Sequence, residues 1–153
     1  MNRSRYVTRH LDSIDRAIIA ALATDGRMTF KELAKQIGLS SPSVTERVHK
    51  LEDAGAIRGH SVLIDPKVFG LGTSAFVRMS AMPGQIRKLE QMLQESPEVV
   101  EADRITGENC FLAKFIVSDA IELKAVIDRF QLHASADTAI ILSSVVARRL
   151  PKI

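Results

Sequence analysis

The stretch GLSSPSVTERVHKLEDAG, residues 38–55, holds the side chains of this sequence with the clearest binding chemistry. Its apolar residues recur at helical spacing, which leaves short hydroxyls at the start of one face and longer charged chains further along. A helix start with small side chains lets phosphate approach closely, and longer polar chains reach base edges. The candidate DNA-binding residues are Ser41, Ser43, Thr45, Glu46, Arg47, His49 and Lys50.

The individual residue types on this face suit different parts of a duplex. Serine, threonine, lysine and arginine suit phosphate or guanine, and Glu46 could accept a hydrogen bond from a cytosine amino group. An ordinary solvent-exposed helix would carry the same residues, so the preference for DNA rests on the neighbouring elements.

The neighbouring elements are short helices. Apolar spacing predicts a helix from Leu11 to Ala23, with Asp12 or Ser13 as its cap. A second helix follows Thr29, whose capping box is completed three residues later, and ends at Gly38. The third begins at Ser41 as N-cap with Pro42 at its first position, and it stops at Gly55. A glycine turn between the last two helices is typical of a helix-turn-helix.

In the second half of the chain, segments of alternating apolar and polar residues appear between the helical patterns. Alternation predicts a strand from Ile57 to Ile64, followed by a turn rich in proline and glycine. The order beyond it is βαββαβ, the ferredoxin-like arrangement of four antiparallel strands with two helices on one face. The expected elements are strands at 74–82, 99–106, 111–117 and 138–147 and helices at 85–95 and 120–130.

These elements predict an α+β chain with three parts. Residues 1–60 form a (winged) helix-turn-helix DNA-binding domain, and residues 61–73 form a linker strand and turn. Residues 74–153 form a ferredoxin-like domain for effector binding and oligomerisation.

Composition and charge restrict the class of protein. The 153 residues are 46% hydrophobic and 25% charged, as in an ordinary soluble globular protein, and no apolar run suits a membrane span or a secretory signal. We therefore expect a cytoplasmic protein. The formal charge of +3 falls within residues 1–60, where Arg3, Arg5 and Arg9 make a basic arm. This asymmetry favours a polyanionic partner, although a solvated tail would look the same.

Catalytic and metal signatures are missing from the sequence. The four histidines are scattered, and no Ser/His/Asp arrangement accompanies a nucleophile turn. The single cysteine, Cys110, supplies neither a disulfide nor a thiolate cluster for zinc. We expect no enzymatic activity, no metal and no cofactor.

Several motifs together carry a resemblance to a known family. LDSIDRAII, DGR, ELAKQIGLS, ERVHKLEDAGAIRGH and IDP occur in this order and at a familiar spacing, and ITGENCFL follows in the second half. The chain resembles the Lrp/AsnC (feast/famine) transcription regulators, whose second half is the RAM effector-binding domain. The resemblance implies a homodimer, often assembled to an octamer, that binds double-stranded DNA and responds to small amino acids.

The resemblance also assigns roles to positions of this chain. It makes residues 41–50 the recognition helix and residues 57–64 the strand that links the domains. The TGENC loop and the last strand would form the wall of an effector pocket between subunits. The candidate effector-binding residues are Thr106, Gly107, Glu108, Asn109, Cys110, Ser143 and Ser144.

The loop itself leaves alternatives open. Gly107 lets the backbone approach a ligand closely, but a plain β-turn would use the same residue types. Family members often carry an acidic residue at the position of Cys110, where a carboxylate pairs with the ammonium group of the ligand. A thiol cannot do so, and Glu108 or Glu101 would have to substitute, or the pocket takes another ligand or none.

Three functions therefore compete. The first is a sequence-specific transcriptional regulator modulated by an amino acid or a related small molecule. The alternative is an effector-independent, weakly specific architectural DNA-binding protein. An enzyme built on the ferredoxin-like half lacks a catalytic constellation, and the fold alone would not support one.

Overall fold

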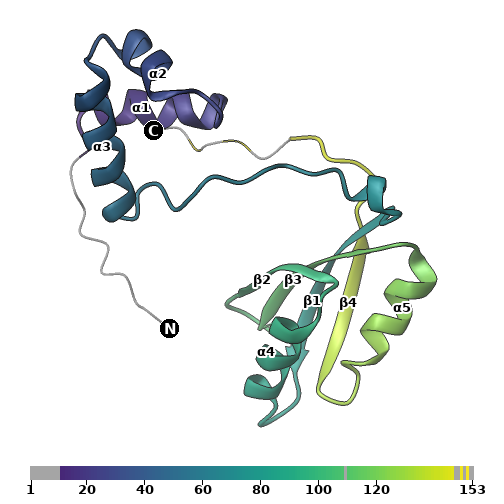
Figure 1. The fold of residues 1–153 in the computed structure, drawn as a ribbon. Coiled ribbons are helices and arrows are strands. Elements are labelled where there is room, and N and C mark those ends of the chain that lie inside the picture. The colour runs from purple at the N-terminus through teal and green to yellow at the C-terminus, as the bar shows by residue number, and fades with distance from the viewer. Residues whose placement is uncertain (1–10, 109, 147–148, 150, 152–153) are drawn as a thin grey trace. The chain divides into compact units, whose positions relative to one another are not determined.

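The chain forms two compact units in the computed structural model, which describes residues 11–108, 110–146, 149 and 151. The first unit contains the described residues up to Leu63 together with Arg149 and Pro151, and the second contains the described residues from Ile64 to Val146. Figure 1 shows the helices of the first unit and the sheet of the second. Within the part of the chain that is described, no helix is both long and apolar enough to cross a membrane.

Three helices make up the first unit, as the sequence predicts. They are α1 (Ser13–Thr24), α2 (Phe30–Ile37) and α3 (Ser41–Asp53). Apolar side chains three and four residues apart form one face of each helix. That face packs inward, because removal of apolar surface from water lowers the free energy. The buried core is Ile18, Ala21, Leu33, Ala34, Val44, Val48 and Leu51.

Capping boxes fix where the first two helices begin. The backbone N–H of Asp15 donates to Asp12 Oδ1 over 2.7 Å, and the N–H of Asp12 donates back to Asp15 Oδ2 over 3.3 Å. Thr29 and Glu32 form the second box, which the sequence predicts. Gly38 ends α2 with φ of 79°, a left-handed conformation that favours glycine. The short turn into α3 is thereby set.

The N-cap of α3 is Ser40, so the prediction of Ser41 is wrong by one residue. The N–H of Val44 donates to the carbonyl of Ser40, which makes this the first hydrogen bond of the helix. An N-cap residue is the one whose carbonyl accepts that bond. The Ser40 hydroxyl also accepts from the N–H of Ser43, and Ser41 becomes the first helical residue.

Residues 57–64 do not form the predicted strand. Alternation predicts a half-buried strand, but a strand also needs a partner edge for its N–H and C=O groups. No described segment of this chain pairs with these residues, and Val62, Leu63 and Ile64 are exposed. A short 3-10 helix, η1 (Pro66–Phe69), follows.

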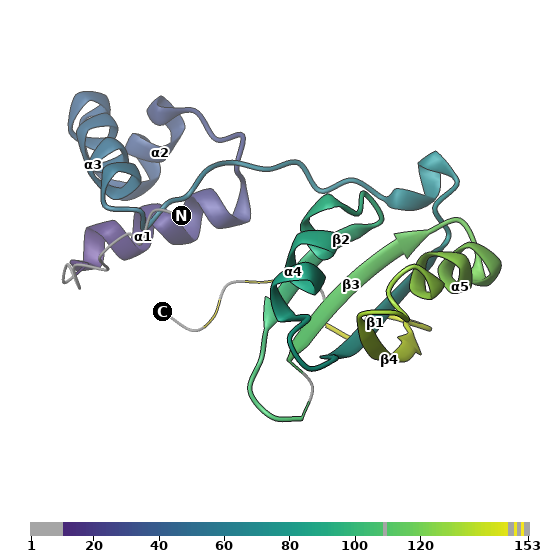
Figure 2. The same cartoon turned by 90° about the horizontal axis from the view of Figure 1, so that it is seen from below.

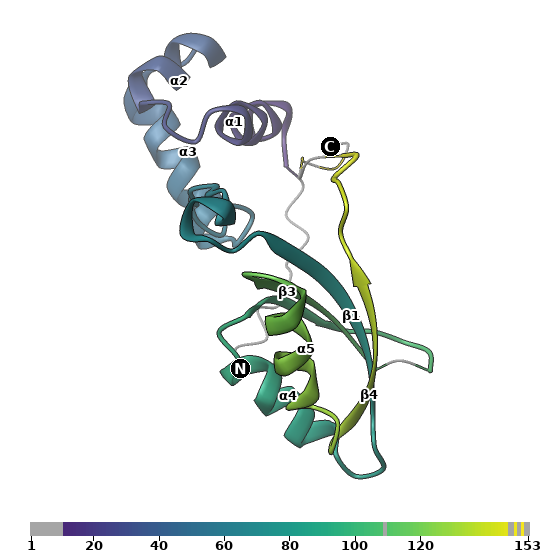
Figure 3. The same cartoon turned by 90° about the vertical axis from the view of Figure 1, so that its right-hand side faces the viewer.

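The second unit confirms the ferredoxin-like prediction. Its elements are β1 (Thr73–Ala81), α4 (Ile86–Glu95), β2 (Val99–Arg104), β3 (Phe111–Val117), α5 (Ala120–Asp128) and β4 (Ala134–Ile140). The strands pair antiparallel in the order β2-β3-β1-β4. Both helices lie on the same face of the sheet (Figures 2 and 3).

The core of this unit lies between the sheet and its two helices. Every second residue in the middle of β1 and along all of β3 is buried beneath the helices, because side chains alternate along a strand. The rings of Phe115 and Phe130 pack edge to face with centroids 6.0 Å apart. The other face of the sheet carries Phe76, Arg78 and Lys114.

The last strand differs from the prediction of 138–147. β4 begins at Ala134, which pairs with Ala81, and ends at Ile140, which pairs with Ala75. A tight turn after α5 sets this register, and the pairing ends where β1 does, since β1 starts at Thr73. The apolar run after Ile140 therefore lies outside the sheet, and Ser143 and Ser144 are not strand residues.

Candidate functional site

Helix α3 presents a polar face to solvent. Val44, Val48 and Leu51 are buried against the other helices and fix the rotation of α3 about its axis. The exposed residues Ser43, Glu46, His49 and Lys50 then share the opposite side; we call these four the polar face of α3. Ser41 and Thr45, also predicted as DNA contacts, are half-buried at the flank.

Hydroxyl groups at the start of α3 form hydrogen bonds within the helix end. The hydroxyls of Ser40 and Ser43 lie 2.8 Å apart, and the Thr45 hydroxyl donates to the carbonyl of Ser41 over 2.9 Å. These bonds hold small side chains close to the backbone. The side chains near Ser43 consequently extend only a short way from the backbone, as close approach of a phosphate requires.

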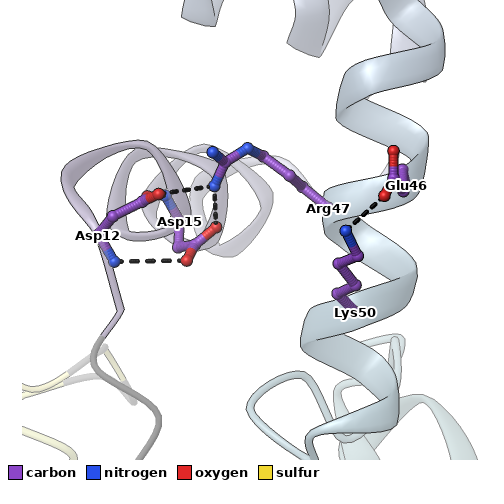
Figure 4. Close-up of polar contacts among 5 residues, drawn as sticks. All are labelled: Asp12, Asp15, Glu46, Arg47 and Lys50. Carbon is purple, nitrogen blue, oxygen red and sulfur yellow. Dashed lines mark hydrogen bonds and ion pairs between the residues drawn. The ribbon is translucent and has the colours of Figure 1, made fainter.

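An ion pair occupies the middle of the polar face. The ammonium of Lys50 donates to Glu46 Oε1 one helical turn away, and the two side chains are 53% and 67% exposed (Figure 4). That hydrogen bond and the charge of Lys50 lower the pKa of Glu46 below its usual value, and Arg47 adds to the effect. Glu46 is therefore ionised at neutral pH.

Arg47 points away from the polar face and toward α1. Its Nη1 donates to Asp12 Oδ2 over 2.8 Å and to Asp15 Oδ1 over 2.7 Å (Figure 4). These hydrogen bonds, first to Asp12 and then to Asp15, raise the pKa of Arg47 above its ordinary range. Arg47 is predicted from the sequence as a DNA contact, and this bridge to α1 is not predicted. No local pattern marks this bridge, because its two partners lie 35 and 32 residues away in the sequence.

His49 sits at the far end of the polar face. Its Nδ1 lies 3.3 Å from Glu52 Oε2, and Nε2 of His60 lies 3.8 Å from the other oxygen of Glu52. Both imidazoles are largely exposed, so water remains available to them.

A polar cavity of about 560 Å³ lies between the starts of α1 and α3. Carboxylates of α1 form one wall, and part of the polar face of α3 forms the other. The lining residues are Asp12, Asp15, Leu39, Ser43, Glu46, Arg47, Lys50 and Leu51. The cavity therefore belongs to the same surface as the candidate DNA contacts.

The predicted effector loop joins β2 to β3. Thr106, Gly107 and Glu108 are exposed, and Gly107 has φ of 109°. Asn109 lies outside the described residues, as does the basic arm at Arg3, Arg5 and Arg9. The loop thus presents backbone and a carboxylate to solvent.

Cys110 ties this loop to β1. Its Sγ accepts a hydrogen bond from the N–H of Ala81 over 3.1 Å, and its own N–H donates to the carbonyl of Met79 over 2.9 Å. The Ser80 hydroxyl also donates to the carbonyl of Glu108 over 2.9 Å. The thiol is thus a hydrogen-bond partner of the backbone at the end of β1.

Ser143 and Ser144 are not brought together with the loop in one chain. The loop contacts Met79 and Ala81 at one end of β1, whereas β4 ends beside Ala75 toward the other end. Six residues of strand separate these positions by roughly 20 Å. The predicted set of effector residues is therefore divided between two ends of the sheet.

Other functional groups are sparse in the part of the chain that the structure describes. No group of three or more histidine, cysteine, aspartate or glutamate side chains there is arranged to hold a metal ion. The polar face of α3 and the β2–β3 loop are therefore the two candidate sites.

Comparison with known proteins gives matches over both units. A family model described as the AsnC-type helix-turn-helix domain matches residues 11–52, and one described as the Lrp/AsnC ligand binding domain matches residues 74–151. HTH-type transcriptional regulator YezC of Bacillus subtilis is 36% identical over 134 residues, which cover 88% of this chain and 95% of that protein.

Solved structures match as well. LrpC of B. subtilis gives a TM-score of 0.87 at 31% identity, with coverage of 92% of this chain and 100% of that one. A feast or famine regulatory protein from M. tuberculosis, solved in complex with L-methionine, gives a TM-score of 0.86 at 33% identity. That match covers 92% of this chain and 98% of the solved one.

Proposed function

Because this chain belongs to the Lrp/AsnC family of transcriptional regulators, we propose that α3 is its recognition helix and binds the major groove of double-stranded DNA. The observation that carries this assignment is the polar face of α3, whose rotation is fixed by three buried apolar residues. Ser43 suits phosphate, and Glu46, His49 and Lys50 reach toward base edges. Ser41 and Thr45 contribute at the flank.

Arg47 has a different role in this proposal. With its guanidinium bonded to Asp12 and Asp15, it holds α1 against α3 and thereby sets the angle at which α3 is presented. We therefore assign Arg47 the role of a positioning residue for the DNA interface, and not that of a residue that contacts phosphate.

A homodimer is part of the proposal. One helix-turn-helix contacts few bases, whereas two recognition helices about 34 to 36 Å apart read two half-sites. Assembly of dimers to an octamer is the further expectation.

A protein with these DNA contacts acts where the DNA is, so we place it in the cytoplasm. We assign it a regulatory rather than an enzymatic role.

The second unit is proposed to bind an amino acid. The relative from M. tuberculosis was solved with L-methionine, and the ligand-binding domain of the family matches residues 74–151, which include the β2–β3 loop of this chain. Since Ser143 and Ser144 lie far from the loop within one chain, a pocket that uses both draws on two copies. Cys110 supplies no charge, and Glu108 or Glu101 supplies the carboxylate that pairs with the ammonium group of the ligand.

Thermal unfolding with each amino acid tests the effector assignment. A ligand that binds the folded state raises its stability, so we expect a higher Tm with L-methionine or another member of the set. No shift with any amino acid would leave a regulator without such an effector.

The DNA assignment competes with a weakly specific architectural role. Affinity for the region upstream of the protein's own gene and for random DNA, measured at several salt concentrations, separates the two. Tighter binding to the upstream region at every salt concentration supports specific regulation. Equal affinities with the same salt dependence would support the architectural role instead.

A further inference from the structure

The Glu46–Lys50 pair contributes little to holding the fold together. Both side chains are more than half exposed, and neither is part of the buried core of the first unit. Exposed pairs of this kind add little to stability because water screens them and both side chains lose freedom. Their placement on the polar face of α3 therefore invites a role in contact with DNA.

An ionised carboxylate on a DNA-binding surface has a cost. Glu46 is repelled by phosphates of every sequence alike, so it weakens binding unless a base offers it a donor. In the major groove the amino groups of cytosine and adenine are such donors. Adenine also places the N7 acceptor beside its amino group, which repels a carboxylate, and cytosine is therefore the better match.

Lys50 complements this match. The paired guanine presents two acceptors, O6 and N7, to the major groove. Glu46 and Lys50 lie four residues apart on the same side of the helix, and the ends of their side chains meet in an ion pair, so both can reach a single base pair. One acidic and one basic side chain at this spacing thus mirror the donor and the acceptors of a C·G pair.

We propose that Glu46 and Lys50 form a single reading unit for one C·G base pair in each half-site, with Glu46 accepting from cytosine and Lys50 donating to guanine. In the free protein the two charges form an ion pair, and on the cognate base pair they exchange that ion pair for base contacts. On other sequences the exchange fails, and the carboxylate is left facing acceptors or phosphate. This inference rests on the proposed docking of α3.

The contacts of Arg47 support the choice of Lys50 as the residue that donates to guanine. Its guanidinium is held by Asp12 and Asp15 at 2.8 and 2.7 Å, so it is committed to α1. Lys50 is the cation whose ammonium bonds Glu46 directly.

The test is selection of duplexes from a pool with a randomised central region, followed by sequencing. Wild-type protein is compared with Glu46→Gln and Glu46→Ala, and Asp53→Asn removes the same charge from the exposed end of the same helix as a control. Circular dichroism checks that each variant is folded. Affinity for random duplex DNA is measured in parallel.

For wild type we expect a motif with a cytosine preference at one position of each half-site. Glu46→Ala should lose that preference by about five- to 150-fold while it binds random DNA more tightly. Glu46→Gln should move the preference toward adenine, because glutamine bonds adenine in bidentate fashion. Asp53→Asn should select the wild-type motif.

Two results would overturn the inference, and they differ in kind. If Glu46→Ala and Glu46→Gln both select the same motif as wild type, the proposed reading unit is wrong, whereas the docking of α3 in the major groove is not contradicted. Failure of the wild-type protein to enrich any motif would remove sequence-specific regulation and the reading unit with it.

Discussion

The guanidinium of Arg47, in the middle of α3, lies 2.7 Å from the carboxylate of Asp15 in the first turn of α1. The same nitrogen bonds Asp12, the N-cap of α1, over 2.8 Å. One side chain thus joins the start of one helix to the candidate recognition helix. The contact connects two parts of the sequence that are 32 residues apart.

Replacement of Arg47 by alanine should lower stability and DNA affinity together. The variant leaves Asp12 and Asp15 without their cation and loosens α3 against α1, so we expect a modest drop in Tm and several-fold weaker DNA binding. Because the side chain is partly exposed, the drop in Tm should shrink as salt is added. Thermal unfolding and fluorescence anisotropy provide the measurements.

Arg16→Ala is the matched control, since it removes the same charge from an exposed position of α1. Equal changes in Tm for Arg16→Ala and Arg47→Ala would show that the bridge has no special role.

Acid should weaken the first unit in a defined pH window. The N–H of Asp15, and then the guanidinium of Arg47, lower the pKa of Asp12 below its ordinary value of 3.8. A depressed carboxyl pKa stabilises the fold above the unfolded pKa and stops doing so as pH falls through the folded pKa. We therefore expect stability to decline below about pH 4.

Asp12→Asn isolates this contribution because asparagine still caps a helix but does not titrate. Its urea midpoint should fall less than that of wild type between pH 5 and pH 3. Parallel pH profiles for the two proteins would assign the acid sensitivity to other groups.

Core substitutions should affect the two units separately. Leu33 and Leu89 are fully buried, one in each core. Replacement of either by alanine should cost about 2–5 kcal/mol of unfolding free energy. Leu33→Ala should abolish DNA binding and leave the fold of the second unit intact, whereas Leu89→Ala should unfold the second unit first.

Calorimetry and the NMR spectra of each variant distinguish the two cases. Loss of signals from both units in Leu33→Ala would contradict two separately stabilised cores.

Substitution at Gly107 should disturb the effector response. Its φ of 109° disfavours any side chain, although a Cβ there meets nothing within 4 Å, so the cost of about 1–3 kcal/mol is conformational. We expect Gly107→Ala to reduce the Tm shift produced by an amino-acid effector.

Gly84→Ala is the control in the same unit, because Gly84 also has a positive φ, of 77°, and open space around it. An effector shift that both variants lose equally would point to general destabilisation rather than to the β2–β3 loop.

Local patterns explain what the sequence predicts well. The helices of the first unit have apolar spacing and caps such as Thr29, whose partners lie within three residues. The strand β3 alternates strictly, and its predicted bounds agree with the structure. These features depend on neighbours in the chain, which a sequence displays directly.

The predictions from sequence are wrong where distant or competing hydrogen-bond partners determine the structure. Ser40 and Ser41 are both good caps, and the hydrogen bond from Val44 selects the first. Residues 57–64 alternate like a strand but pair with no segment among the described residues, and pairing with β1 ends β4 at Ile140. The bond from Arg47 to α1 follows no local pattern, so only the structure shows it.

Lys50→Ala tests the central claim, that the polar face of α3 binds DNA, most directly. The affinity of wild type and Lys50→Ala for one DNA fragment is measured by anisotropy over a range of salt concentrations. Lys124→Ala serves as control, because Lys124 forms the same kind of one-turn ion pair, with Asp128 on α5. Lys50→Ala should bind more weakly and with a shallower salt dependence, because a cation is lost from the DNA-facing surface, while Lys124→Ala binds as wild type. Affinity and slope that are unchanged in Lys50→Ala would contradict the account.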